Sequence, residues 1–237
     1  NSLFNNRSIS IITSLLFACH PIHTESVTWI SGRTDIIAGV FFLSAFYLYQ
    51  KAIHSLPINE KNCSLNSHEV LKLFLKRGKI FYLCSIILFA LAMLCKEMVA
   101  TLPFILIAYT HYFAGLKNGR QFKIPLLLSS PYFFVILLYG FTRFIILGIH
   151  TVVNTGGEEM RGFYPTILSF TKTIFIYLFK LFYPAHLSAY IQNPMSFSIT
   201  EPTIILSIFG VAVLIFLIVW LKKRWAGMSF LILFYLV

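Results

Sequence analysis

Acidic residues are scarce in this chain of 237 residues, where 8 Asp and Glu stand against 19 Lys and Arg. Charged residues make up 11% of the sequence and hydrophobic residues 58%, with 25 Phe and 12 Tyr. Together with a mean hydropathy of +0.80, this composition lies outside the range of soluble domains. Several apolar runs approach the length that crosses a bilayer, so the sequence predicts a polytopic α-helical membrane protein.

The motifs of several enzyme classes are also missing from the sequence. It has no glycine-rich phosphate loop, no Walker pattern and no G-x-S-x-G elbow, so nothing points to a P-loop nucleotidase or a serine hydrolase. The 4 cysteines show no paired metal-type spacing, and most lie in or beside apolar runs, where cysteine behaves as a small hydrophobe. We therefore expect neither a disulfide framework nor a cysteine-based metal site.

The apolar runs predict a single all-α transmembrane bundle over residues 1–237. The expected spans are about 8–19, 35–50, 80–95, 98–114, 124–143, 202–221 and 225–237. Residues 163–183 are apolar enough to span, but a crossing there would place the basic triplet Lys222–Arg224 outside. We expect instead an outer-face amphipathic helix or a re-entrant pair within a long functional loop, 146–202.

The basic residues orient these spans. Thirteen of the 19 fall on one side with two acids, while the other side balances six basic residues against six acids. The positive-inside rule makes the first side cytoplasmic. Basic loops that face anionic lipid account for the net charge of +11, so we expect no nucleic-acid partner.

The outer side gathers the scarce ionisable residues. The segment 20–35 (HPIHTESVTWISGRTD) holds His20, His23, Glu25, Arg33 and Asp35 between two apolar runs. Polar groups at membrane depth are costly and tend to line a site. These residues can also be interfacial caps, with Arg33 and Asp35 as a local ion pair. The two histidines with Glu25 can ligate a metal, but no fourth ligand is evident nearby, so we expect no metal site.

Two further groups lie on the same side. Lys96 and Glu97 sit at a tight junction between two apolar runs, and because adjacent residues do not share a helix face, one should point inward to a partner. Glu97 can pair with Arg33 or Arg143. Lys96 can bind phosphate as a point charge, and Arg143, at a helix end, can bind two phosphate oxygens or simply snorkel.

Four stretches resemble one family in the same order along the chain: HPIHTESVTWISGRTDIIAGVFF, LCKEMVATLP, FTRFIILG and YLFKLFYPAHLSAY. They are similar to motifs of the transmembrane and tetratricopeptide-repeat-containing protein O-mannosyltransferases and their bacterial relatives. The family's Asp-Tyr pair appears here as Ala189-Tyr190.

The resemblance implies a fold of the glycosyltransferase C superfamily. It implies transfer of a sugar, mannose in the animal members, from a polyprenyl or dolichyl phosphate to a protein Ser or Thr hydroxyl on the luminal or periplasmic face. Arg33, Lys96 and Arg143 would then bind the donor phosphate. His20, His23, Glu25, Asp35, Glu97 and Tyr190 would shape the pocket, and no cofactor besides the lipid-linked donor is expected.

The resemblance also implies that parts of the machinery lie elsewhere. The family's catalytic acid belongs to a loop that would precede Asn1, and its repeats would follow Val237, so this fragment alone should be inactive. The expected location is the endoplasmic reticulum membrane or a bacterial inner membrane. Two alternatives stay open: a polytopic transporter of an anionic or lipid-linked solute, and a catalytically silent scaffold of the same fold.

Overall fold

The computed structural model describes residues 6–29, 32–55, 76, 78–113, 123–148, 163–184 and 196–237. The described residues form helices and connections without strands, and they divide into two compact units. We call Trp29–His150 the central unit, and Asn1–Thr28 with Thr151–Leu236 the terminal unit. Each unit is described by itself.

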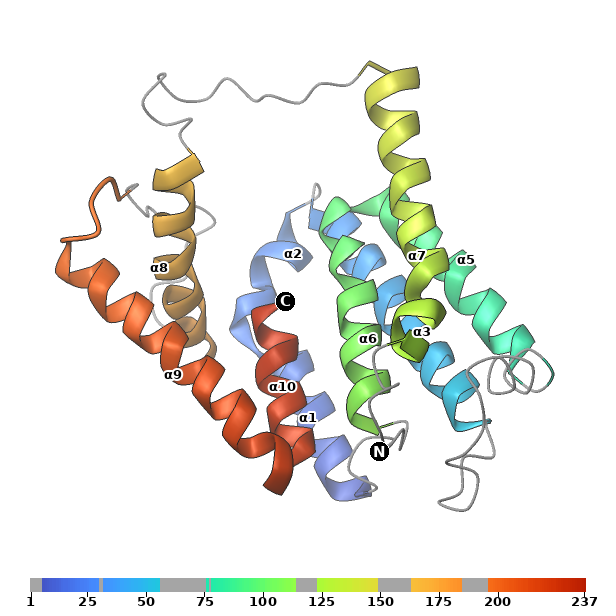
Figure 1. Cartoon of the computed structure of the whole chain (residues 1–237), viewed down its shortest axis with the longest axis horizontal. Helices are drawn as coiled ribbons and strands as arrows, with labels where there is room; N and C mark the ends of the chain where they lie inside the picture. Colours follow the sequence, from blue (N-terminus) through green and yellow to red (C-terminus); the bar gives the residue numbers. More distant parts are fainter. Residues whose placement is uncertain are drawn as a thin grey trace. The chain divides into compact units, whose positions relative to one another are not determined.

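The central unit is a helical bundle built from the longest apolar runs in the middle of the sequence (Figure 1). Its elements are α3 (Arg33–His54), α5 (Lys79–Cys95), the 3-10 turn η4 (Glu97–Thr101), α6 (Leu102–Phe113), α7 (Lys123–Phe141) and the π-helical turn η5 (Thr142–Ile146). Helix α3 packs along α5, and α7 packs against both α5 and α6.

Four large aromatic side chains fill the middle of this bundle: Tyr49, Phe89, Tyr109 and Tyr132 are almost fully buried. The hydroxyl groups of the three tyrosines are hydrogen bonded, as expected where a bilayer offers no water to an unpaired hydroxyl. The Tyr49 and Thr110 hydroxyls are 2.7 Å apart, and Tyr109 Oη lies 3.1 Å from His54 Nε2. The core is thus apolar in its bulk and joined across helices by hydroxyl groups.

The terminal unit brings together the two ends of the described chain. It contains α1 (Arg7–Cys19), the 3-10 turn η1 (Pro21–His23), α2 (Thr24–Thr28), α8 (Phe163–Phe182), α9 (Pro202–Arg224) and α10 (Ala226–Leu236). Helix α9 packs against α8 and α10. Two hydroxyl-to-carbonyl hydrogen bonds support this packing, from Tyr235 to Ile174 O (2.6 Å) and from Ser229 to Ile218 O (2.7 Å).

The all-α membrane fold is confirmed. Among the described residues, four helices are long and apolar enough to cross a bilayer by length and composition: Arg33–His54, Lys123–Ile146, Tyr164–Phe182 and Pro202–Lys222. Most predicted helix bounds agree with the structure within two residues. The span expected at 35–50 is longer, because α3 continues through Lys51 to His54, and the span expected at 98–114 opens with a 3-10 turn before α6 begins.

Residues 163–183, where the sequence left two forms open, make one continuous helix rather than a re-entrant pair. A single helix is the form expected of an amphipathic interfacial segment, but α8 is also long enough to span. Its relation to the bilayer, the orientation of the spans and the single-domain organisation stay predictions.

Candidate functional site

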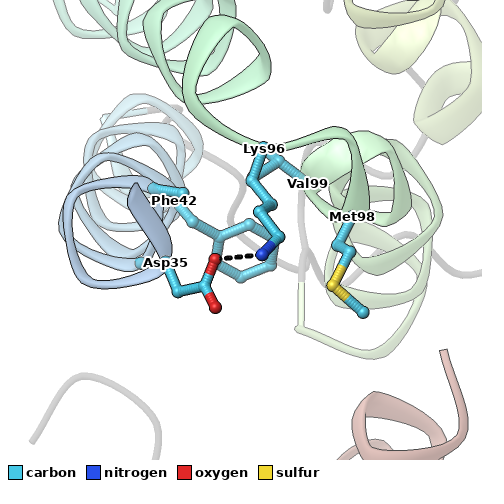
Figure 2. A pocket seen from close by; sticks show the side chains of 7 residues that line it. Asp35, Phe42, Lys96, Met98 and Val99 are labelled. Carbon is cyan, nitrogen blue, oxygen red and sulfur yellow. Dashed lines mark ion pairs between the residues drawn. The ribbon is translucent and has the colours of Figure 1, made fainter. Parts of the chain in front are cut away.

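Two ion pairs meet at the junction between α5 and α6. The first joins Lys96 to Asp35 (Figure 2). Helix α5 ends at Cys95, and the extended backbone of Lys96 (φ −155°, ψ 133°) turns its side chain away from that helix. Asp35 lies in the first turn of α3, where a negative charge is favourable beside the exposed N–H groups. Both side chains are about 40% exposed, so the pair lies at the edge of the bundle.

The second ion pair joins Glu97 to Arg143. The Arg143 Nη1 group also donates a hydrogen bond of 2.7 Å to the Tyr139 hydroxyl, and the guanidinium carbon lies 5.9 Å from the centre of the Tyr139 ring. The neighbours Lys96 and Glu97 therefore bind two different helices, α3 and the end of α7. The expected pairing of Glu97 with Arg143, one of two options, is confirmed.

A π-helical turn presents Arg143. Residues Thr142–Ile146 continue α7 with one extra residue per turn, a form that is rare and often found at functional sites. The Thr142 hydroxyl donates a hydrogen bond to the Leu138 carbonyl (2.8 Å) and so links this turn to the preceding turn of α7. Arg143 follows Tyr139 by four residues and lies close to the end of the apolar span.

Two hollows flank these ion pairs within the central unit. One, of about 270 Å³, lies beside the Asp35–Lys96 pair, with Phe42, Met98 and Val99 among its walls (Figure 2). The other, of about 300 Å³, is a groove between α5 and α7. Its walls are mostly apolar, and Arg143 stands among them: Ala90, Met93, Leu94, Val135, Leu138, Tyr139, Thr142, Arg143 and Leu147.

The groove between α5 and α7 combines an apolar body with one cation. Leu94, Leu138 and Leu147 are more than half exposed, so the groove opens onto a surface suited to lipid. Within the part of the chain that the structure describes, Arg143 Nε is buried and has no hydrogen-bond partner. An amphipathic anion with a single apolar chain fits this combination of surfaces.

The predicted histidines belong to the terminal unit and have local partners. The Ile22 amide donates to His20 Nδ1 (3.2 Å), so the ring proton of neutral His20 resides on Nε2, which donates to the Leu181 carbonyl (2.9 Å). His23 packs against Phe17 with ring centroids 4.4 Å apart and the ring planes tilted by 54°. His20 therefore ties the turn after α1 to the end of α8.

Of the other predicted site residues, the structure describes some with their side chains and others not. Arg33 is the exposed first residue of α3, and Asp35 pairs with Lys96. The local Arg33–Asp35 pair, which the sequence left open as an alternative, is disfavoured because residues two apart on a helix face different directions. Glu25 falls in α2 without a described side chain, and Tyr190 lies outside the described residues. No group of three metal-ligating side chains occurs among the residues that the structure describes.

Tyr139 belongs to the candidate site, although no sequence motif singles it out. Tyr139 holds Arg143 by a hydrogen bond and by its ring face, and the spacing of four residues in a helix would have indicated this contact.

Comparison with known proteins finds relatives over part of the chain. The chain is 34% identical over 119 residues to protein O-mannosyl-transferase TMTC1 of Mus musculus, across 50% of this chain and 12% of the mouse protein. It is 50% identical over 50 residues to protein O-mannosyl-transferase TMTC3 of Homo sapiens, across 21% of this chain and 6% of that protein. Over 109 residues it is 32% identical to protein O-mannosyl-transferase Tmtc3 of Drosophila melanogaster, across 46% of this chain and 10% of the fly protein.

By sequence, the chain is similar over part of its length to protein O-mannosyl-transferases of several animals. The resemblance read from the four motifs is thereby confirmed. The aligned region spans about an eighth of the length of the mouse relative. No family model and no solved structure matches the chain.

Proposed function

We propose that the full-length protein is a membrane glycosyltransferase. It transfers a sugar, mannose in this proposal, from a polyprenyl or dolichyl phosphate to a Ser or Thr hydroxyl of an acceptor protein. The reaction takes place on the luminal face of the endoplasmic reticulum membrane, or on the periplasmic face in a bacterium. The similarity to protein O-mannosyl-transferases supports the transfer of mannose to protein oxygen.

The observation that supports this proposal best is Arg143 in the wall of an apolar groove. A lipid-linked sugar phosphate needs an apolar surface for its chain and a cation for its phosphate. The groove between α5 and α7 offers the first, and the partly buried guanidinium offers the second. Arginine suits this role because its planar fork can donate two hydrogen bonds to one phosphate.

Glycosyl transfer from phosphate has two chemical demands. A base must take the proton of the acceptor hydroxyl, and cations must stabilise the charge on the leaving phosphate. We assign the second task to Arg143, Lys96 and Arg33. We assign the base to none of the residues of this chain. Asp35 and Glu97 stay in the proposal as pocket residues beside these cations. The pocket roles of His20, His23, Glu25 and Tyr190 stay predictions from the sequence.

The test measures transfer of labelled mannose from dolichyl-phosphate mannose to an acceptor peptide, with microsomes from cells that express the full-length protein. Arg143→Gln should reduce transfer by at least tenfold and raise the donor KM, because the phosphate loses a charged partner. Arg33→Ala and Lys96→Ala should each reduce it as well. Lys123→Gln is the matched control, since Lys123 is an exposed cation at the opposite end of α7.

The outcomes separate the candidate functions. Undiminished transfer by a variant at normal protein level removes that cation from the mechanism. A full-length protein that transfers no sugar but moves the lipid-linked donor across vesicles favours the transporter. A protein that does neither is the silent scaffold.

A further inference from the structure

We infer that Glu97 competes with the lipid phosphate for Arg143 and thereby promotes release of the product. This inference rests on the proposed function, and it adds a residue that determines which phosphate the site retains. It follows from the unequal exposure of the two partners, from the way Arg143 is held, and from the change in phosphate charge during transfer.

Arg143 is fixed, whereas Glu97 can leave. The Arg143 side chain is 19% exposed, and Tyr139 holds it by a 2.7 Å hydrogen bond and by contact with its ring face. The Glu97 side chain is 59% exposed, so its carboxylate regains water when the ion pair opens. An ion pair with such an exposed member contributes little net free energy, and an incoming anion can replace it.

The incoming anion reaches Arg143 from the groove. Arg143 and Tyr139 both line the hollow between α5 and α7, and Arg143 Nε has no partner among the described residues. A guanidinium has five N–H donors, so Glu97 does not use all of them. A phosphate at the end of the groove therefore meets a cation that is positioned but already partly neutralised by a carboxylate.

The charge on the phosphate rises during the reaction. The acceptor oxygen forms a bond to the anomeric carbon, and the bond from that carbon to the phosphate oxygen breaks. The electron pair stays on the phosphate, and the acceptor proton goes to the base. The donor is a phosphodiester with one negative charge, whereas the product is a monoester with a charge of about −1.5 to −2.

Without a competing carboxylate, Arg143 would therefore bind the product more tightly than the donor. Glu97 opposes this effect, because its carboxylate returns to Arg143 and takes the place of the departing monoester. Neutral lipids have no anion to bind Arg143 and need not displace Glu97, so this competition does not affect them. The choice between the monoester product and the diester donor then depends on Glu97 as well as on Arg143.

The experiment measures the binding of three lipids to the purified full-length protein in nanodiscs: polyprenyl monophosphate, polyprenyl-phosphate mannose and neutral polyprenol. In Glu97→Gln the affinity for the monophosphate should rise about two- to fivefold, the range set by a partly exposed ion pair. The affinity for the donor should rise less, and polyprenol binding should not change. Glu201→Gln, a carboxylate of the terminal unit, should bind all three lipids as the wild type does.

Two further variants keep the test decisive. Arg143→Gln should weaken binding of both phosphate lipids, and Glu97→Asp, which keeps the charge on a shorter side chain, should lie between the wild type and Glu97→Gln. Unchanged or weaker monophosphate binding in folded Glu97→Gln and Glu97→Asp overturns the competition and makes Glu97 a support for Arg143. If the wild type binds neither phosphate lipid, the proposed function itself fails.

Discussion

The hydroxyl oxygens of Ser85 and Tyr132 lie 2.7 Å apart, in the middle of the central unit, and both residues are fully buried. Ser85 donates its own proton to the Ala45 carbonyl (2.6 Å), so Tyr132 is the donor to Ser85. One serine on α5 therefore links α3 to α7. In a bilayer such a link replaces part of the hydrophobic driving force that holds soluble bundles together.

This relationship predicts an order of stabilities. Tyr132→Phe removes one hydrogen bond and leaves Ser85 paired with Ala45, so it should cost about 0.6–1 kcal/mol. Ser85→Ala leaves the Tyr132 hydroxyl buried without its acceptor and should cost more, about 1–3 kcal/mol. Unfolding in detergent measures both, with the half-exposed Tyr177→Phe as the neutral control. A smaller cost for Ser85→Ala than for Tyr132→Phe would contradict the assigned donor.

The Asp35–Lys96 pair predicts a small coupling energy. Both side chains are about 40% exposed, so water screens the attraction between them. A double-mutant cycle with Asp35→Asn and Lys96→Met should give about 0.2–1 kcal/mol, and the value should fall as salt is added. Thermal unfolding of the four proteins measures it. A coupling of zero at low salt would mean that the pair positions Lys96 without stabilising the bundle.

The sequence predicts the helices well and their contacts only in part. Apolar run length places most helix ends, and the rule that neighbours do not share a helix face indicates that Lys96 and Glu97 have different partners. The choice of Asp35 for Lys96 depends on how α3 packs along α5, which no local pattern encodes. The buried tyrosine hydroxyls are also hidden in the sequence, because a tyrosine in an apolar run reads as another hydrophobe.

Helix α9 approaches α8 at Gly210. A Cβ atom at this position would lie 2.7 Å and 3.1 Å from two ring carbons of Phe175. Gly210→Ala should therefore force the helices apart or the ring out of its rotamer and cost about 1–3 kcal/mol. Phe175→Leu in the same protein should restore part of this loss, since it removes the ring.

Gly140 on α7 is the matched control for this substitution. A Cβ atom there would meet nothing within 4 Å, so Gly140→Ala should be neutral or gain up to about 1 kcal/mol from helix propensity. Unfolding midpoints in detergent compare the two alanines. Equal midpoints for Gly210→Ala and Gly140→Ala would show that α8 and α9 do not pack as closely as the structure has them.

The loop before α9 predicts a dependence of stability on pH. The Ser196 hydroxyl (2.8 Å) and the Phe197 amide (3.3 Å) both donate to the Glu201 carboxylate, at the N-cap of α9. The hydrogen bond from Ser196 contributes most to lowering the pKa of Glu201 below the ordinary value of 4.5. The charged form is thus favoured in the folded state, and the unfolded chain binds the proton more readily.

The sign of the effect follows from this difference. The stability that Glu201 contributes is complete above the unfolded pKa and is lost as the pH falls through the lower folded pKa. The wild type should therefore lose more stability than Glu201→Gln as the pH is lowered from about 6 to about 3. Ser196→Ala should raise the pKa of Glu201 in the folded state and reduce its difference from the pKa in the unfolded chain. Melting curves that stay parallel over this range would mean that the carboxylate is not held by these two donors.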